Sequence, residues 1–265
     1  MAQPQIDEPI TPKLSTARLL AAVASALVVA VLIWWPLAMQ IPGFLPTPLD
    51  VVRAFLQAIA SAELYDNMVA TLRRVAIGWV CSVFLGSALG VAMGRSKVVD
   101  SFALPWVMIG LAIPAPVIII FCILFFGIEE SSTLLALIIS VTPFVVNIVF
   151  EGVRSTDPGL IEMSEVYGLS RRLRLREVIL PQIAPSLMAG VRFGFAMSWK
   201  IVVIIEALSQ NTGIGAQLEL FFKLLRPDSV LAWTLSFTVI MVLVELLVFR
   251  TAEARLFRWQ RTAEN

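Results

Sequence analysis

The sequence predicts an all-α integral membrane protein with six transmembrane helices. Its 265 residues are 58% hydrophobic and only 15% charged, and the mean hydropathy is +0.88, whereas a soluble domain carries about a quarter charged residues. Six apolar segments reach the ~20 residues that a helix needs to cross a bilayer. They are residues 18–39, 75–94, 103–126, 133–150, 184–206 and 230–249.

The positions of the basic residues predict how these spans are oriented. Two of the twenty Lys and Arg residues lie inside a span, namely Arg192 and Lys200. If the N-terminus is inside, five others fall in outer segments and the remaining thirteen in inner segments. Because cytoplasmic loops are rich in Lys and Arg, we expect both termini, a tail at 1–17 and the loop at 155–183 to be cytoplasmic.

The segment between the first and second spans and the second span itself each carry a local pattern. Prolines 42, 46 and 48 are followed by a mildly amphipathic stretch, which predicts a short surface helix ending near Leu72. Small residues then recur every fourth position at Gly78, Ser82, Gly86, Gly90 and Gly94. Such a stripe lets two helix backbones approach closely in lipid. We expect it to pack within the chain, in preference to a moving or dimeric interface.

The third span contains Pro114-Ala115-Pro116 near its middle. Proline inside a helix removes a hydrogen bond and clashes with the preceding turn, so we expect a kink or a break there. Non-helical backbone at membrane depth is tolerated where protein buries it or water reaches it. Pro114 and Pro116 therefore either line a substrate path or form a kink packed against neighbouring helices.

The polar loop before the fifth span predicts two short helices joined by a glycine turn. Asp157 and Pro158 are an N-cap and a first helical residue, and the helix then runs over about 158–167. Gly168 suits a left-handed C-cap. Ser170 can cap a second helix, which ends where Pro181 marks the entry to the fifth span.

Lys200 places a charge well inside the fifth span. A charge at that depth costs several kcal/mol in lipid and is a functional hypothesis by default. Either Lys200 faces a translocation path and helps an anion to pass, or it forms an internal ion pair with Glu206 or Glu245. Glu206, near the outer end of the span, can also line an outer gate or contact an outer partner.

The loop as a whole resembles a known motif. Glu162 is followed six residues later by Gly168, and after ten further residues by Val178-Ile179-Leu180-Pro181. This order and spacing resemble the "EAA" loop of ABC-importer permeases. The similarity extends from about Leu45 to the C-terminus through several further motifs. They are Leu45-Pro46-Thr47-Pro48, Thr71-Leu72-Arg73-Arg74, Phe126-Gly127-Ile128, Gly190-Val191-Arg192-Phe193, Trp199, Glu206 and Gly213-Ile214-Gly215. Within these permeases, the chain is most similar to the nitrate/sulfonate/taurine/bicarbonate group.

This resemblance implies a type I ABC importer permease fold, with a cytoplasmic coupling helix in a permease domain at 18–265. The residues that it assigns to ATPase coupling are Glu162, Met163, Ser164, Tyr167, Gly168 and Pro181. The candidate residues of the translocation path are Pro114, Pro116, Trp199, Lys200 and Glu206. The chain departs from the family pattern in three places. Met163 and Ser164 replace the two alanines of the signature, Val117-Ile118-Ile119-Ile120 stands where the sulfonate group tends to carry further prolines, and Lys200 replaces a residue that is typically apolar.

The resemblance also implies partners and a location. They are an ABC ATPase homodimer that holds the ATP and magnesium, a second copy of the permease, a periplasmic or lipid-anchored solute-binding protein, and membrane lipid of a bacterial inner membrane. The implied cargo is a small, anionic solute such as a sulfonate, taurine, nitrate, bicarbonate or an organic acid.

Composition and missing motifs argue against other classes of function. No lysine follows a glycine, so the chain has no P-loop, and we expect no cofactor, catalytic residue or metal on it. The sequence contains no histidine, the commonest general base, and no hydrolase motif, which disfavours a membrane enzyme. The net charge of +1 gives no electrostatic case for nucleic acid. An ion-coupled secondary transporter is the alternative, although histidine relays and an inverted repeat are missing.

Overall fold

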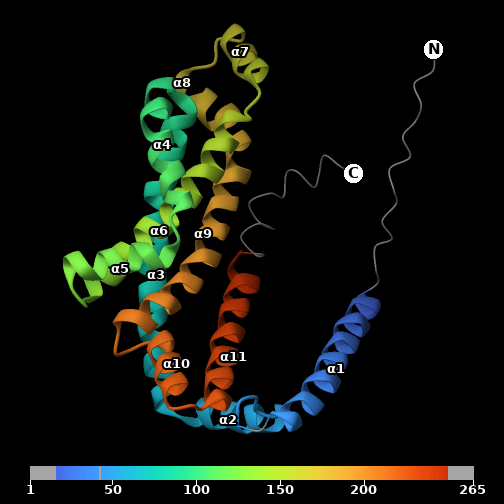
Figure 1. Ribbon diagram of the computed structural model, residues 1–265. Helices are drawn as coiled ribbons and strands as arrows, with labels where there is room; N and C mark the ends of the chain where they lie inside the picture. The colour runs from blue at the N-terminus through green and yellow to red at the C-terminus, as the bar shows by residue number, and fades with distance from the viewer. Residues whose placement is uncertain (1–15, 42, 250–265) are drawn as a thin grey trace.

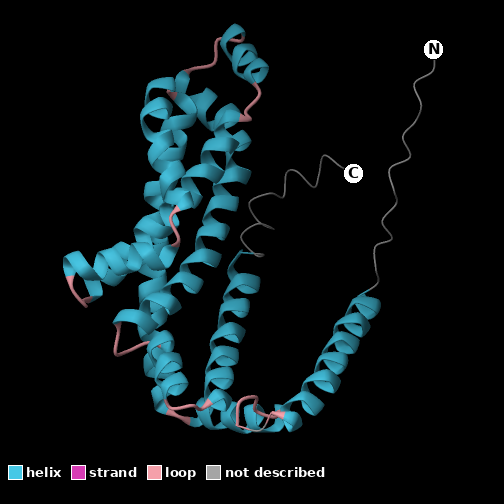
Figure 2. Ribbon diagram, in the orientation of Figure 1, coloured by secondary structure: helices cyan, strands magenta, loops and turns pink. Residues whose placement is uncertain are grey.

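The computed structural model describes residues 16–41 and 43–249, except the side chains of residues 16–24 and 27, and every regular element in it is a helix (Figure 2). In chain order the elements are α1 (Thr16–Gln40), α2 (Pro48–Ala60), α3 (Ala62–Arg95), α4 (Lys97–Ala112), α5 (Ala115–Phe126), α6 (Glu130–Arg154), α7 (Pro158–Val166), α8 (Arg171–Arg174), the π-helix η1 (Leu175–Ile179), α9 (Leu180–Ser209), α10 (Ile214–Lys223), α11 (Pro227–Val244) and the π-helix η2 (Glu245–Phe249). Most of the predicted tail at 1–17 lies outside the described residues, as does the chain after residue 249.

The described residues contain four helical stretches that are long and apolar enough to cross a membrane. They are Ala62–Arg95, Glu130–Arg154, Arg171–Ser209 and Pro227–Phe249. The pair α4 and α5 is bent by 100° and adds a fifth span if it is counted as one. The predicted first span at 18–39 coincides with α1, of which Val28–Gln40 is apolar but short among the residues whose side chains are described.

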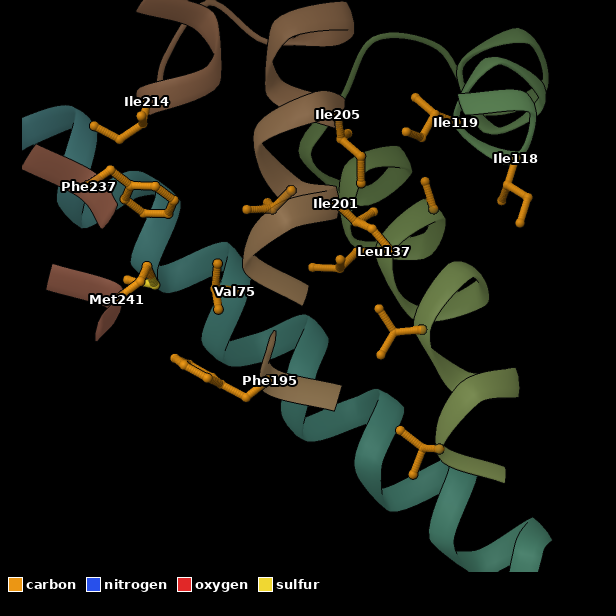
Figure 3. Close-up of a cluster of buried hydrophobic side chains, with 14 of the residues drawn as sticks. Val75, Ile118, Ile119, Leu137, Phe195, Ile201, Ile205, Ile214, Phe237 and Met241 are labelled. Carbon is orange, nitrogen blue, oxygen red and sulfur yellow. The ribbon is translucent and has the colours of Figure 1, made fainter. Parts of the chain in front are cut away.

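Helices α3, α6 and α9 form the centre of the bundle, and their buried side chains meet in one cluster (Figure 3). Val75, Leu137 and Ile205 are fully or almost fully buried in it. The small-residue stripe of α3 faces α6: a Cβ on Gly90 would lie 2.8 Å from the carbonyl oxygen of Val146. The prediction that this stripe packs within the chain is therefore confirmed.

The third predicted span is broken, as the prolines predicted. α4 ends at Ala112, Ile113 and Pro114 are extended, and α5 begins at Ala115. Figure 1 shows α5 projecting from the side of the bundle, while its first two turns add Ile118, Ile119 and Cys122 to the central cluster. In the same view α7 lies at one end of the bundle and α2 at the other.

The predicted surface helix ending near Leu72 is wrong in its length. α2 ends at Ala60, and the residues after Ser61 belong to α3. The reason is that Ser61 serves both helices: its hydroxyl donates to the carbonyl of Ala58, 2.8 Å away, and accepts from the N–H of Leu64. α3 therefore starts thirteen residues before the predicted span at 75–94.

Candidate functional site

The short helix α7 is held at both ends by the residues that the sequence singled out. The Asp157 carboxylate accepts from the N–H of Gly159, 2.8 Å away, as an N-cap does. At the other end Gly168 has a φ of +68°. Its N–H donates to Glu165 and the N–H of Leu169 donates to Ser164, which is the Schellman pattern. The predicted cap and glycine turn are confirmed.

α7 presents an apolar surface to its surroundings. Val166 is 87% exposed and Tyr167 is 75% exposed, and Leu160 and Met163 are also exposed. Exposed apolar side chains that lie together typically mark an interaction surface. The exposed Glu162 adds a charge to the same helix.

Ser164, which the family resemblance assigns to ATPase coupling, does not lie on this exposed surface. Ser164 is only 2% exposed, and its hydroxyl donates to the carbonyl of Ile161, 2.6 Å away. Its carbonyl accepts the Leu169 N–H of the glycine turn, so the residue is turned into the loop. A partner on α7 would therefore meet the neighbours of Ser164 and not its side chain.

Pro181 does not begin a separate helix, contrary to the prediction. α8, η1 and α9 continue from Arg171 to Ser209 as one 39-residue helical stretch. The N–H of Leu180 donates to the carbonyl of Leu175, which closes a π turn. Pro181, which has no N–H to donate, is the next residue and lies inside this continuous stretch, directly after the π turn.

Lys200 is exposed on α9, and neither acid proposed as its partner is available. Glu206 is paired with Arg74, and Glu245 is paired with Arg192. No other carboxylate in the described ranges lies within ion-pairing distance of Lys200. Its ammonium lies 5.6 Å from the ring centre of Trp199, and that ring packs edge-to-face on Phe237. The ion-pair alternatives that the sequence left open are thus excluded for the described residues.

Glu206 is buried in a polar network at the opposite end of the bundle from α7. Its Oε1 lies 2.8 Å from Nη1 of Arg74, and neither side chain is more than 3% exposed. The hydroxyl of Thr71 lies 3.0 and 2.9 Å from the two carboxylate oxygens, and the N–H of Gly215 donates from 3.0 Å. The carboxylate of Glu206, a candidate residue of the translocation path, is therefore enclosed by the chain itself in this structure.

Arg74 extends the network to further elements. Its Nη2 lies 2.8 Å from a carboxylate oxygen of Glu130 at the start of α6, and its Nη1 donates to the carbonyl of Thr212 from 2.7 Å. Asn67 accepts from the N–H of Gly213. One arginine therefore joins α3, α6, α9 and the loop before α10.

The glycines in that loop allow its close approach to Glu206. Gly213 has a φ of +112°, and a Cβ on Gly215 would lie 2.1 Å from the carbonyl oxygen of Val203. Sequence reasoning named Thr71–Arg74, Glu206 and Gly213–Gly215 as separate motifs and missed that they form one network. The available signal was the three-residue spacing of Thr71 and Arg74, which puts both on one face of a helix at the edge of a span.

Pro114, Pro116 and Trp199 have different surroundings. Both prolines are exposed; Pro114 lies in the break between α4 and α5, and Pro116 lies in the first turn of α5. Trp199 is half-buried between α9 and α11. Helix α5 packs against α6 and α9, so the break and the helix that carries Lys200 belong to neighbouring elements.

These features define a polytopic α-helical membrane protein with a broken span and with a short exposed helix in a loop at one end of the bundle. A family model described as "Binding-protein-dependent transport system inner membrane component" matches residues 82–258. The chain therefore belongs to this family and is a permease component of an ABC importer.

Two of its relatives are sulfonate and taurine permeases, as the motifs predicted. The chain is 29% identical over 241 residues to the taurine transport system permease protein TauC of Escherichia coli (strain K12), covering 88% of this chain and 87% of that protein. It is 27% identical over 221 residues to the putative aliphatic sulfonates transport permease protein SsuC of Bacillus subtilis (strain 168), covering 83% and 79%. The riboflavin transport system permease protein RibX of Chloroflexus aurantiacus is 28% identical, covering 86% and 87%.

A solved structure shares the fold. The MetNI methionine ABC transporter in an inward-facing conformation superposes with a TM-score of 0.59 over 74% of this chain and 94% of that chain, at 19% sequence identity. At this identity the likeness concerns the fold alone.

Proposed function

We propose that this chain is the transmembrane subunit of an ATP-driven importer in a bacterial inner membrane, and that α7 is its cytoplasmic coupling helix. α1 completes a set of six spans, and both termini are cytoplasmic. An ABC ATPase homodimer binds the ATP and magnesium, a second copy of this chain completes the path, and a periplasmic or lipid-anchored binding protein delivers the solute.

The observation that carries this proposal is the exposed apolar surface of α7. A short helix that lays its apolar side into a groove is a common mode of protein recognition. The caps at Asp157 and Gly168 make α7 rigid without help from a partner. A rigid helix at the end of a bundle can transmit the movement of a docked subunit.

Substitution of the exposed surface tests this docking. Tyr167→Asp should lower the amount of co-purifying ATPase at least tenfold, because a central aromatic anchor typically contributes about 2 kcal/mol or more. The matched control is Phe222→Asp in α10, which is 72% exposed at the other end of the bundle. Equal loss in both variants, or in neither, would contradict docking at α7.

We further propose that the Lys200 face of α9 lines the path and that the solute is anionic. A charge at the centre of a span is costly in lipid, by about 2.5–3.5 kcal/mol or more, and Lys200 has no acidic partner in the described residues. In a complex with two copies, two such lysines attract anions into the path. Pro114, Pro116 and Trp199 are then neighbours of this path.

Uptake by the reconstituted complex tests the role of Lys200. Taurine and an aliphatic sulfonate are the probes, and riboflavin is the comparison solute without an anionic group. Lys200→Leu should reduce uptake of the accepted anion at least tenfold, while Lys200→Arg should retain most of it. Equal uptake by the leucine and arginine variants would show that the charge is not used.

A further inference from the structure

The position of α7 between two helices raises the question of which one follows it when it moves. The linker from α6 remains attached to α6 as far as Thr156, whose N–H and hydroxyl both bond to the carbonyl of Val153. From Asp157 onward the contacts change. Its N–H donates to Oε1 of Gln182 in α9, 2.8 Å away.

The amide group of Gln182 is held in this contact through both its oxygen and its nitrogen. Its Nε2 donates to the carbonyl of Val178 in η1, 3.0 Å away. Because the Asp157 N–H is a donor, only the amide oxygen of Gln182 can accept it. The amide therefore bridges the first residue of the α7 loop to the base of α9 in one defined orientation.

The other end of α7 has its own attachment. Glu165, in the last turn of α7, forms an ion pair with Arg174 of α8. The arginine side chain is 22% exposed and the glutamate side chain 58% exposed. α8, η1 and α9 form one continuous helical stretch, so both attachments of α7 lead to the same helix.

Between the two attachment points lies the π segment η1, Leu175–Ile179. Single π turns inside α-helices frequently occur at functional sites. Here η1 separates the part that holds the end of α7 from the span that carries Lys200.

We infer that Gln182 is a positioning residue that, together with the Glu165–Arg174 ion pair, fastens α7 to α8–η1–α9, so that a displacement of α7 is delivered to α9 and not to α6. The linkage rests on the proposed function, since it requires a partner that moves α7. The hinge of α7 relative to α6 lies at the junction of Thr156 and Asp157. The helix that carries Lys200 is then the one that the ATPase moves.

Two substitutions of Gln182 separate this role from a merely structural one. Gln182→Glu keeps an oxygen that accepts the Asp157 N–H, whereas Gln182→Met keeps the length and removes the acceptor. In the reconstituted complex with its ATPase, we expect Gln182→Met to hydrolyse ATP within twofold of the wild type. We expect its uptake per ATP to fall at least tenfold. Gln182→Glu should retain at least half of the wild-type uptake per ATP.

The ion pair gives an independent variant. Glu165→Arg alone should lower uptake per ATP, and the exchange Glu165→Arg with Arg174→Glu should restore it. If Gln182→Met binds the ATPase and shows wild-type uptake per ATP, the attachment of α7 to α9 is overturned, while the proposed function stands. If the wild-type chain binds no ATPase at all, the proposed function fails and the attachment fails with it.

Discussion

Arg74 offers the sharpest test of how the bundle is held together. Arg74→Met removes the guanidinium and leaves the Glu206 carboxylate, which is 0% exposed, with Thr71 and the Gly215 N–H as its remaining donors. Breaking a buried ion pair from one side costs about 3–5 kcal/mol, because an uncompensated charge stays buried. We expect a loss of that size in the free energy of unfolding.

The reverse substitution should cost less. Glu206→Met leaves Arg74 paired with Glu130 and bonded to the Thr212 carbonyl, so its charge is still compensated. Replacing both partners by methionine should cost less than Arg74→Met alone, since the double variant buries no unpaired carboxylate. The two substitutions differ in cost because Arg74 has a second acidic partner, Glu130, whereas Glu206 has no second basic partner among the described residues.

Equilibrium unfolding of the purified chain in mixed micelles measures these differences. The control is Lys223→Met, which removes an exposed ion pair with Glu219 four residues earlier, a type worth about 0.3–0.5 kcal/mol. An Arg74→Met variant that costs no more than this control would show that the buried ion pair does not stabilise the bundle. A double variant that loses the sum of the two single losses would show that Arg74 and Glu206 are not coupled.

Three further variants test local features. Thr47→Ala should destabilise α2 by about 1 kcal/mol, seen as faster hydrogen exchange in α2. The Thr47 hydrogen bonds lower the pKa of Asp50. Their stabilising contribution is therefore present above the ordinary carboxyl pKa and is lost as the pH falls through the lowered pKa. An unchanged exchange rate in α2 of Thr47→Ala would contradict the cap. Gly90→Leu should lower the unfolding free energy by about 1–3 kcal/mol or more through overpacking, whereas exposed Ala88→Leu should not, and equal effects would refute close packing on α6. Gly168→Val should abolish uptake while the chain still inserts, because a β-branched residue is strained at a φ of +68°; normal uptake would show that the turn is dispensable.

Local chemistry predicted much of this structure. The break at Pro114, the N-cap at Asp157 and the turn at Gly168 each follow from a conformational rule that acts within a few residues. These three features depend on neighbours in the sequence. The four-residue spacing of the small residues in α3 predicted close packing, because it places them on one face of a helix, but it did not identify α6 as the helix they meet.

The features that the sequence did not predict depend on distant residues. Glu206 meets Arg74, 132 residues earlier in the chain, and no local pattern pairs them. The uninterrupted passage of the helix through Pro181 depends on a π turn in which Leu180 bonds back to Leu175. The burial of Ser164 depends on how the glycine turn folds back onto α7.

Gentle affinity purification from native membranes tests the proposal that α7 docks a separate ATPase. We expect the wild-type chain to co-purify with a stoichiometric partner that carries a Walker A motif, and we expect Tyr167→Asp to lose this partner while Phe222→Asp keeps it. A homo-oligomer without such a partner, whose transport is indifferent to ATP, would overturn the proposal.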